Sequence, residues 1–142
     1  MAVTTNTQTE EAQPVPITAW IGPVAAAWLV PGAGHFLLKK TGRGMLLFAS
    51  IALMFLFGLF MRGMMFKPEP GADYLTSLIN YGGFAGNLAA GAMYLLSSMF
   101  GYNQPDLPGS VHDYGTKFLV TAGLLNVLAM VDTYEIASGK KD

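Results

Sequence analysis

The chain has 142 residues, of which 52% are hydrophobic and only 12% charged, whereas an average soluble domain carries roughly 25% charged residues. Eight basic and nine acidic side chains give a net charge of -1, which excludes the basic field that nucleic-acid binding needs. The absence of cysteine excludes disulfides, metal–thiolate sites, thiol catalysis and covalent attachment of c-type haem.

The charged residues leave four long uncharged windows, which predict an all-α integral membrane protein with about four transmembrane helices and short loops. These windows are residues 12–38, 44–61, 74–105 and 118–131. A spanning helix needs about 17–25 mostly apolar residues, and three windows meet that length outright. The fourth meets it when Lys117 and Asp132 lie at the lipid headgroups. We therefore expect a polar tail over residues 1–15 and one helical transmembrane domain over residues 16–142.

The first expected helix covers about residues 17–38 and is irregular. Pro31 removes a backbone donor and should kink or break the helix, and lipid tolerates the freed groups only where protein satisfies them. The helix is therefore expected as a kinked span, as two segments or as a re-entrant structure. A tight connection over residues 39–43 leads to the second expected helix, about residues 44–61, which is the plainest span in the chain.

The third expected helix, about residues 74–100, follows an exposed loop over residues 62–73 and carries small residues at every fourth position. Gly82, Gly86 and Ala90 form a smooth strip that lets another helix approach closely. Asn87, and Asn126 on the fourth expected helix (about residues 114–136), are amides in apolar surroundings, for which hydrogen bonds between helices are the simplest explanation. We assign these five residues to helix packing.

The sides of the membrane follow from the number of spans. Four spans place the tail, the 62–73 loop and the C-terminus on one side, and the 39–43 connection with the 101–111 loop on the other. Each side then carries four basic residues, so the total decides nothing. Because the first helix usually dominates and has basic residues only after it, we expect the termini outside and the 39–43 connection inside.

The acids, hydroxyls and histidines form no recognisable catalytic motif, so we predict neither an enzyme nor a metal site, and no cofactor. One hypothesis concerns His35 and His112, which the four-span topology places on the same side of the membrane. Two such histidines could ligate a haem or a chlorophyll. The simpler interpretation is that both make ordinary hydrogen bonds. Asp132 and Glu135 are expected to mark the water boundary, and the alternative is that the pair binds a cation or the arginine of a partner protein.

The segment Trp28-Leu-Val-Pro-Gly-Ala-Gly-His-Phe-Leu-Leu-Lys-Lys-Thr-Gly-Arg-Gly44 resembles a known hairpin. Small uncharacterised bacterial membrane proteins carry a similar "PGxGH…GRG" turn between two helices. The segment is more distantly similar to the two-transmembrane-helix domain family, whose turn is also rich in glycine and aromatic residues. The resemblance covers residues 20–62 and implies a multi-pass protein of the bacterial cytoplasmic (inner) membrane, with no catalytic residue to transfer.

The leading functional hypothesis is a non-catalytic accessory or structural subunit of a larger bacterial membrane complex, with energy-converting (respiratory or photosynthetic) complexes as the candidate setting. Its partners would be membrane lipids and other subunits, reached through the Gly82–Ala90 strip and the tail. The first alternative is a cofactor- or pigment-binding subunit that uses His35 or His112. The second is a small transporter, which would need a polar path through the middle of the membrane that the charge pattern does not supply.

Overall fold

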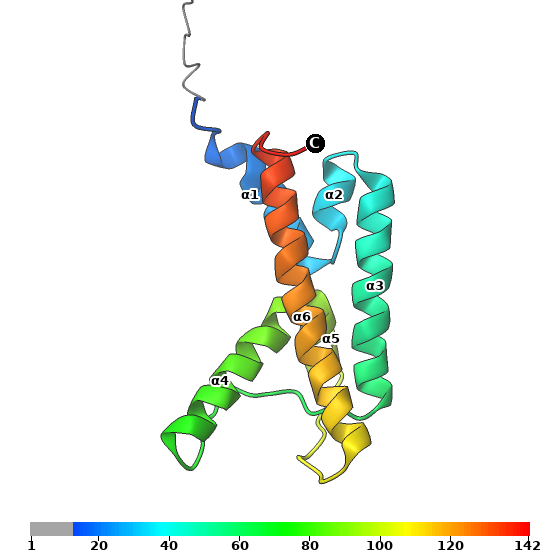
Figure 1. Ribbon diagram of the computed structural model, residues 1–142, viewed down its shortest axis with the longest axis vertical. Helices are drawn as coiled ribbons and strands as arrows, with labels where there is room; N and C mark the ends of the chain where they lie inside the picture. The colour runs from blue at the N-terminus through cyan, green and yellow to red at the C-terminus, as the bar shows by residue number, and fades with distance from the viewer. Residues whose placement is uncertain (1–12) are drawn as a thin grey trace, which may run out of the picture.

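The computed structural model describes residues 13–142, and within that range all regular structure is helical. The helix that organises the others is the last one, which runs the full length of the molecule with α1, α3 and α4 packed against it (Figure 1). The prediction of an all-α protein is therefore confirmed for the described residues. The helices are α1 (Ile17–Leu29), α2 (Ala33–Leu37), α3 (Thr41–Phe60), α4 (Tyr74–Ala89), α5 (Ala92–Met99) and α6 (Ser110–Ala137).

The helices α3 and α6 are the two described helices that are long and apolar enough to cross a membrane. They correspond to the second and fourth expected spans and lie side by side along their lengths (Figure 1). Ile51 and Phe55 of α3 and Leu119 of α6 are buried in the core. However, only 22% of the most apolar window of α3 and 33% of that of α6 is buried. Most of their apolar side chains therefore face outward.

The residues expected as one helix over 17–38 form a half-length hairpin instead. The helix α1 ends at Leu29, the chain reverses through Val30, Pro31 and Gly32, and α2 returns toward the end from which α1 came (Figure 1). Gly32 has a φ of 80°, and a Cβ there would overlap the carbonyl oxygen of Gly44 at the start of α3. The predicted break at Pro31 is confirmed.

The expected third helix, residues 74–100, is also two helices, and here the prediction of a continuous span is wrong. The helix α4 ends at Ala89, and α5 starts at Ala92 and runs back toward the end at which α4 began (Figure 1). Gly91 has a φ of 65°, which L side chains rarely adopt, and a Cβ there would overlap the carbonyl oxygen of Trp28. With two helices broken in this way, a count of four spans is not confirmed.

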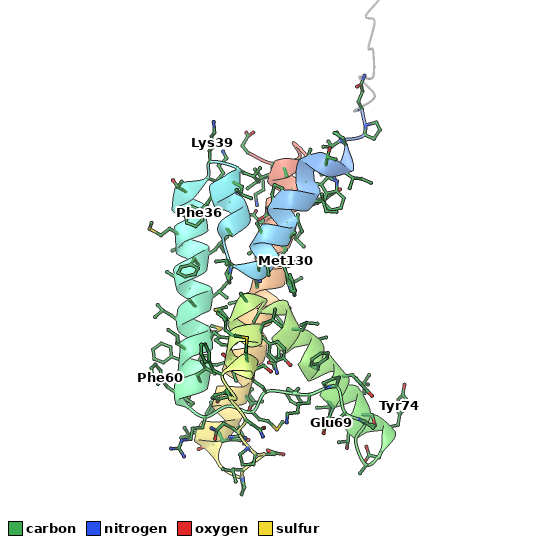
Figure 2. The ribbon with its side chains drawn as sticks, turned by 180° about the vertical axis from the view of Figure 1, so that it is seen from behind. Phe36, Lys39, Phe60, Glu69, Tyr74 and Met130 are labelled. Carbon is green, nitrogen blue, oxygen red and sulfur yellow. The ribbon has the colours of Figure 1, made fainter. Side chains whose placement is uncertain are left out.

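Because the structure has two half-length hairpins in place of two complete spans, the loops that share an end of the molecule differ from those expected. Figure 2 shows Lys39 at one end and Glu69 at the other, and we call these the Lys39 end and the Glu69 end. The described C-terminal residues lie at the Lys39 end, where Arg43 is 3.5 Å from Asp132. The 62–73 and 101–109 loops meet at the Glu69 end. The expected grouping of the 39–43 connection with the 101–111 loop is wrong, because it assumed four complete crossings.

Candidate functional site

The turns of the two hairpins meet at the middle of α6, in what we call the central junction: Trp28, Leu88, Ala89, Gly91 and Asn126. The side chain of Asn126 is fully buried, and its amide nitrogen donates hydrogen bonds to the carbonyls of Trp28 (3.1 Å) and Ala89 (2.9 Å). Helices leave the carbonyls of their last turn without intrahelical donors. One amide thus completes the ends of both α1 and α4.

The indole of Trp28 reinforces the central junction, since its Nε1 donates to the carbonyl of Leu88 at 3.1 Å. The three hydrogen bonds link α1, α4 and α6, which are far apart in the sequence. Two helix carboxyl ends that face each other at one point need such donors, because their carbonyl dipoles repel one another. These hydrogen bonds therefore hold the ends of α1 and α4 against the middle of α6.

Glycine at position 123 brings α4 close to α6 beside the central junction. A Cβ on Gly123 would overlap the carbonyl oxygen of Gly86, so the two backbones are in direct contact. Ala90 is fully buried in the core cluster of the same region. Of the predicted packing residues, Gly86, Ala90 and Asn126 thus pack within this chain. Gly82 faces open space among the described residues.

Asn87 is the fifth predicted packing residue, and it lies in α4 beside Gly86. Its side chain is fully buried, and neither atom of its amide has a hydrogen-bond partner within the described residues. The Oδ1 atom of Asn126 is also buried without a partner there. The hydrogen bond predicted for Asn126 is present, whereas the one predicted for Asn87 is not found in the part of the chain that the structure describes.

The second polar group, which we call the Lys39-end cluster, consists of His35, Arg43, Asp132, Thr133 and Lys141. The ring of His35 is fully buried, with Nε2 2.8 Å from Oδ2 of Asp132 and Nδ1 3.2 Å from Oγ1 of Thr133. Asp132 also pairs with Arg43 and, more closely, with Lys141. This one carboxylate therefore joins α2, α3, α6 and the C-terminal residues.

A carboxylate, an imidazole and a hydroxyl follow one another in this cluster, in the order used by Ser-His-Asp hydrolases. The hydroxyl belongs to Thr133, which is fully buried and donates to the carbonyl of Ala129 at 2.8 Å. A groove reaches Asp132, but its lining includes neither His35 nor Thr133. A nucleophile must reach its substrate, whereas the hydroxyl of Thr133 is enclosed by the protein, where its hydrogen bond with His35 joins α2 to α6.

The other candidate histidine, His112, lies in the first turn of α6 at the Glu69 end. Its Nδ1 donates to the carbonyl of Arg62 at 2.8 Å, and its Nε2 accepts the N–H of Leu107 at 3.4 Å. About 20 residues of helix, or about 30 Å, separate it from the cluster that holds His35. The expectation that both histidines lie on the same side is wrong, and they cannot ligate one cofactor together.

The loops at the Glu69 end are held by Tyr102, whose hydroxyl donates to the carbonyl of Gly63 at 2.7 Å. Burial raises the pKa of the Tyr102 hydroxyl, and the charge of Arg62 opposes that rise. The hydroxyl therefore keeps its proton, and its hydrogen bond to Gly63, at neutral pH.

Asp73 caps α4 by accepting the N–H of Thr76, and this hydrogen bond lowers the pKa of the Asp73 carboxyl.

A cleft opens between α4 and α6 at the Glu69 end, because α4 leans away from α6 (Figure 1). It has a volume of about 650 Å³ and ends toward the middle of the molecule, near Gly83 and Val120. Its polar wall residues are Thr76, Asn80, Asp106, Asp113, Thr116, Lys117 and Thr121. Within the described residues, no group of three or more histidine, aspartate or glutamate side chains could hold a metal ion.

Sequence reasoning singled out His35 and Asp132 separately but did not predict that they would contact each other. A carboxylate such as Asp132 near the end of an apolar helix needs a cation, and an arginine of a partner protein was one of its expected interpretations. The cations beside Asp132 are instead Lys141 and, less closely, Arg43 of the same chain. The sequence shows that Asp132 needs a cation. Pairing it with Arg43, however, requires knowledge of the first hairpin, which places the 39–43 connection beside the end of α6.

Two long apolar helices, two half-length hairpins and a central polar junction define this all-helical protein. The chain belongs to DUF6677, a family of unknown function, whose model matches residues 23–142. The matched range includes the turns of both hairpins, the central junction and the Lys39-end cluster. No curated protein and no solved structure matches the chain.

Proposed function

We propose that the protein is a non-catalytic structural subunit of a larger membrane complex, and that a helix of a partner subunit packs on the outer face of α4. The observation that carries the proposal is the packing of α4 on one side only. The helix rests mainly on α6, and its opposite face has no neighbour among the described residues.

The membrane setting is supported by the outward faces of α3 and α6. Leu46 and Leu53 of α3 and Leu128 of α6 are among the large apolar side chains that are more than half exposed. A soluble protein rarely exposes so much contiguous apolar surface.

The outer face of α4 carries small side chains, which contact with lipid alone would not require. Leu75, Leu78, Gly82 and Ala85 are exposed and recur at helical spacing, so they share one face. Gly82 has no described atom near the position of a Cβ. In membranes, small residues at such positions let two helices come into close contact. A partner helix with small residues of its own fits this face.

The absence of cysteine makes this proposal directly testable, because any introduced thiol is the only one in the chain. Gly82→Cys, treated with a thiol crosslinker in native membranes, should give one adduct of discrete mass, in which mass spectrometry identifies another subunit. Leu53→Cys, on the exposed face of α3, is the matched control and should give no such adduct. Equal adducts from both positions, or an adduct of two copies of this chain, would contradict the proposal.

The tail was also expected to contact a partner subunit, but its residues 1–12 lie outside the described residues.

Haem or pigment binding is the less favoured alternative, because both ring nitrogens of His35 and of His112 already have partners. A transporter is also less favoured. The cleft at the Glu69 end stops before the central junction, where the Gly86 and Gly123 backbones touch.

We further propose that the Lys39 end faces the cytoplasm. It carries Lys39, Lys40, Arg43, Lys140 and Lys141, whereas the Glu69 end carries Arg62, Lys67 and Lys117. Basic residues favour the cytoplasmic side. This proposal replaces the expectation of external termini, because the 39–43 connection shares an end with the C-terminal residues.

A pair of reporter fusions tests this orientation. We expect green fluorescent protein fused after Asp142 to fluoresce and alkaline phosphatase at the same position to be inactive, since the phosphatase needs the oxidising periplasm. The phosphatase inserted within the exposed 67–70 segment should be active and serves as the control. Phosphatase activity at Asp142 together with inactivity in the 67–70 segment would reverse the proposed orientation.

A further inference from the structure

A groove of about 430 Å³ lies between α3 and α6 at the Lys39 end, and we call it the α3–α6 groove. Its walls are apolar for most of their length, and its charged residues gather at the end near the helix termini. This combination of an apolar channel and a charged opening is amphipathic. The apolar walls are formed by Leu46, Leu47, Ile51, Leu125, Leu128 and Ala129, and the charged residues are Arg43, Asp132 and Lys141.

The charged residues that line the opening are the cations Arg43 and Lys141 and the less exposed carboxylate of Asp132, and the carboxylate of Glu135 lies close to Lys141. The side chains of Arg43 and Lys141 are 41% and 46% exposed, whereas that of Asp132 is 20% exposed. Arg43 touches Asp132 and the Asp142 carbonyl only at 3.5 Å. Lys141 pairs with Asp132 and lies 3.9 Å from Glu135. A guanidinium has five donors and an ammonium three, so donors of both groups remain free to bind an anion.

The nature of that anion follows from the walls behind it. A free phosphate would use only the opening, whereas a phospholipid would also bury an acyl chain along the apolar walls. Arginine binds phosphate oxygens with two parallel hydrogen bonds, and basic pockets on the cytoplasmic side of membrane helices bind lipid headgroups. Lys39 and Lys40, in the adjacent turn, lie outside the lining of the groove.

We propose that the α3–α6 groove binds an anionic phospholipid, with its phosphate at Arg43 and Lys141 and one acyl chain between Leu46 and Leu125. The proposal rests on the membrane placement argued above, but it does not depend on the partner at α4. The site would fasten α3 to α6 on the side where the Lys39-end cluster already joins them.

Native mass spectrometry of the full chain, released from vesicles of equimolar phosphatidylglycerol and phosphatidylcholine, tests this proposal. We expect phosphatidylglycerol adducts in about thirtyfold excess, since Arg43 and Lys141 each contribute about 1 kcal/mol near such a lipid and about 1.4 kcal/mol is a factor of ten. The double variant Arg43→Gln, Lys141→Gln should lose the excess. The matched control Lys39→Gln, Lys40→Gln removes the same charge at the same end, outside the groove lining, and should keep it. Equal loss in both double variants would overturn the proposal.

Two further measurements keep the result decisive. Ser50→Trp places a large side chain at an exposed lining position and should reduce phosphatidylglycerol adducts without removing any charge, even if the double variant at Arg43 and Lys141 folds poorly. Glycerol 3-phosphate should not compete, and effective competition by it would show that the acyl chain contributes nothing. Failure of the chain to enter vesicles at all would contradict the membrane placement, and so is distinguishable from failure of this site.

Discussion

Replacing Asn126 with leucine is expected to lower the free energy of unfolding by about 2–6 kcal/mol. The substitution keeps the approximate size of the side chain but removes the amide that donates to the carbonyls of Trp28 and Ala89. Each buried acceptor left without a donor costs about 1–3 kcal/mol. The loss should be measured by reversible unfolding in mixed detergent micelles, with helix content followed by circular dichroism.

Asn80→Leu is the matched control for this substitution. Asn80 is also an amide on a helix, but it donates to the carbonyl of Glu69 at 3.3 Å at an exposed site. Water can replace that bond, so we expect a change within about 0.5 kcal/mol. If both variants unfold at the same denaturant concentration, the central junction is not a major source of stability.

Gly91→Ala is expected to be the most destabilising glycine-to-alanine substitution in the chain. It should lower the free energy of unfolding by about 3 kcal/mol or more. The residue combines a φ of 65° with a position at which an added Cβ would overlap the carbonyl oxygen of Trp28 at the end of α1. A side chain there is strained, at about 1–3 kcal/mol, and its Cβ would also displace the backbone of Trp28, at about 1–3 kcal/mol. We expect this variant to elute as aggregate in size-exclusion chromatography in mild detergent.

Gly82→Ala is the control, since it adds the same methyl group to a helix of the same hairpin. Nothing lies within 4 Å of its Cβ position, and alanine favours helix over glycine by about 1 kcal/mol. This variant should therefore be as stable as the natural chain or slightly more stable. Monodisperse Gly91→Ala protein with unchanged stability would mean that the two hairpin turns do not meet as described.

The helices α3 and α6 could be predicted from the sequence because each is a long apolar run bounded by charge. The first hairpin was partly predictable, since Pro31 has a local effect on its own helix. The second was not. An apolar segment with glycines at positions 82, 86 and 91 is compatible with a smooth continuous helix and with a helix that ends at a glycine of positive φ. Only the contact of Gly91 with Trp28, 63 positions away in sequence, distinguishes the continuous helix from the broken one.

The same limit applies to the candidate site. His35 and Asn126 stood out because polar side chains in apolar runs need partners. Their partners, however, lie up to 98 positions away, and the four-span topology placed His35 at the wrong end relative to His112. Sequence reasoning could identify which residues needed hydrogen bonds, but the two chain reversals decided which residues supply them.

The central junction also constrains the order in which the protein can be made. The ribosome synthesises the two hairpins first, while the side chain that completes both of them is supplied by the final helix. Until that helix leaves the exit tunnel, the ends of α1 and α4 lack their shared donor and need water or the lining of the insertion machinery in its place. Biogenesis must therefore keep both turns sheltered until α6 has been synthesised.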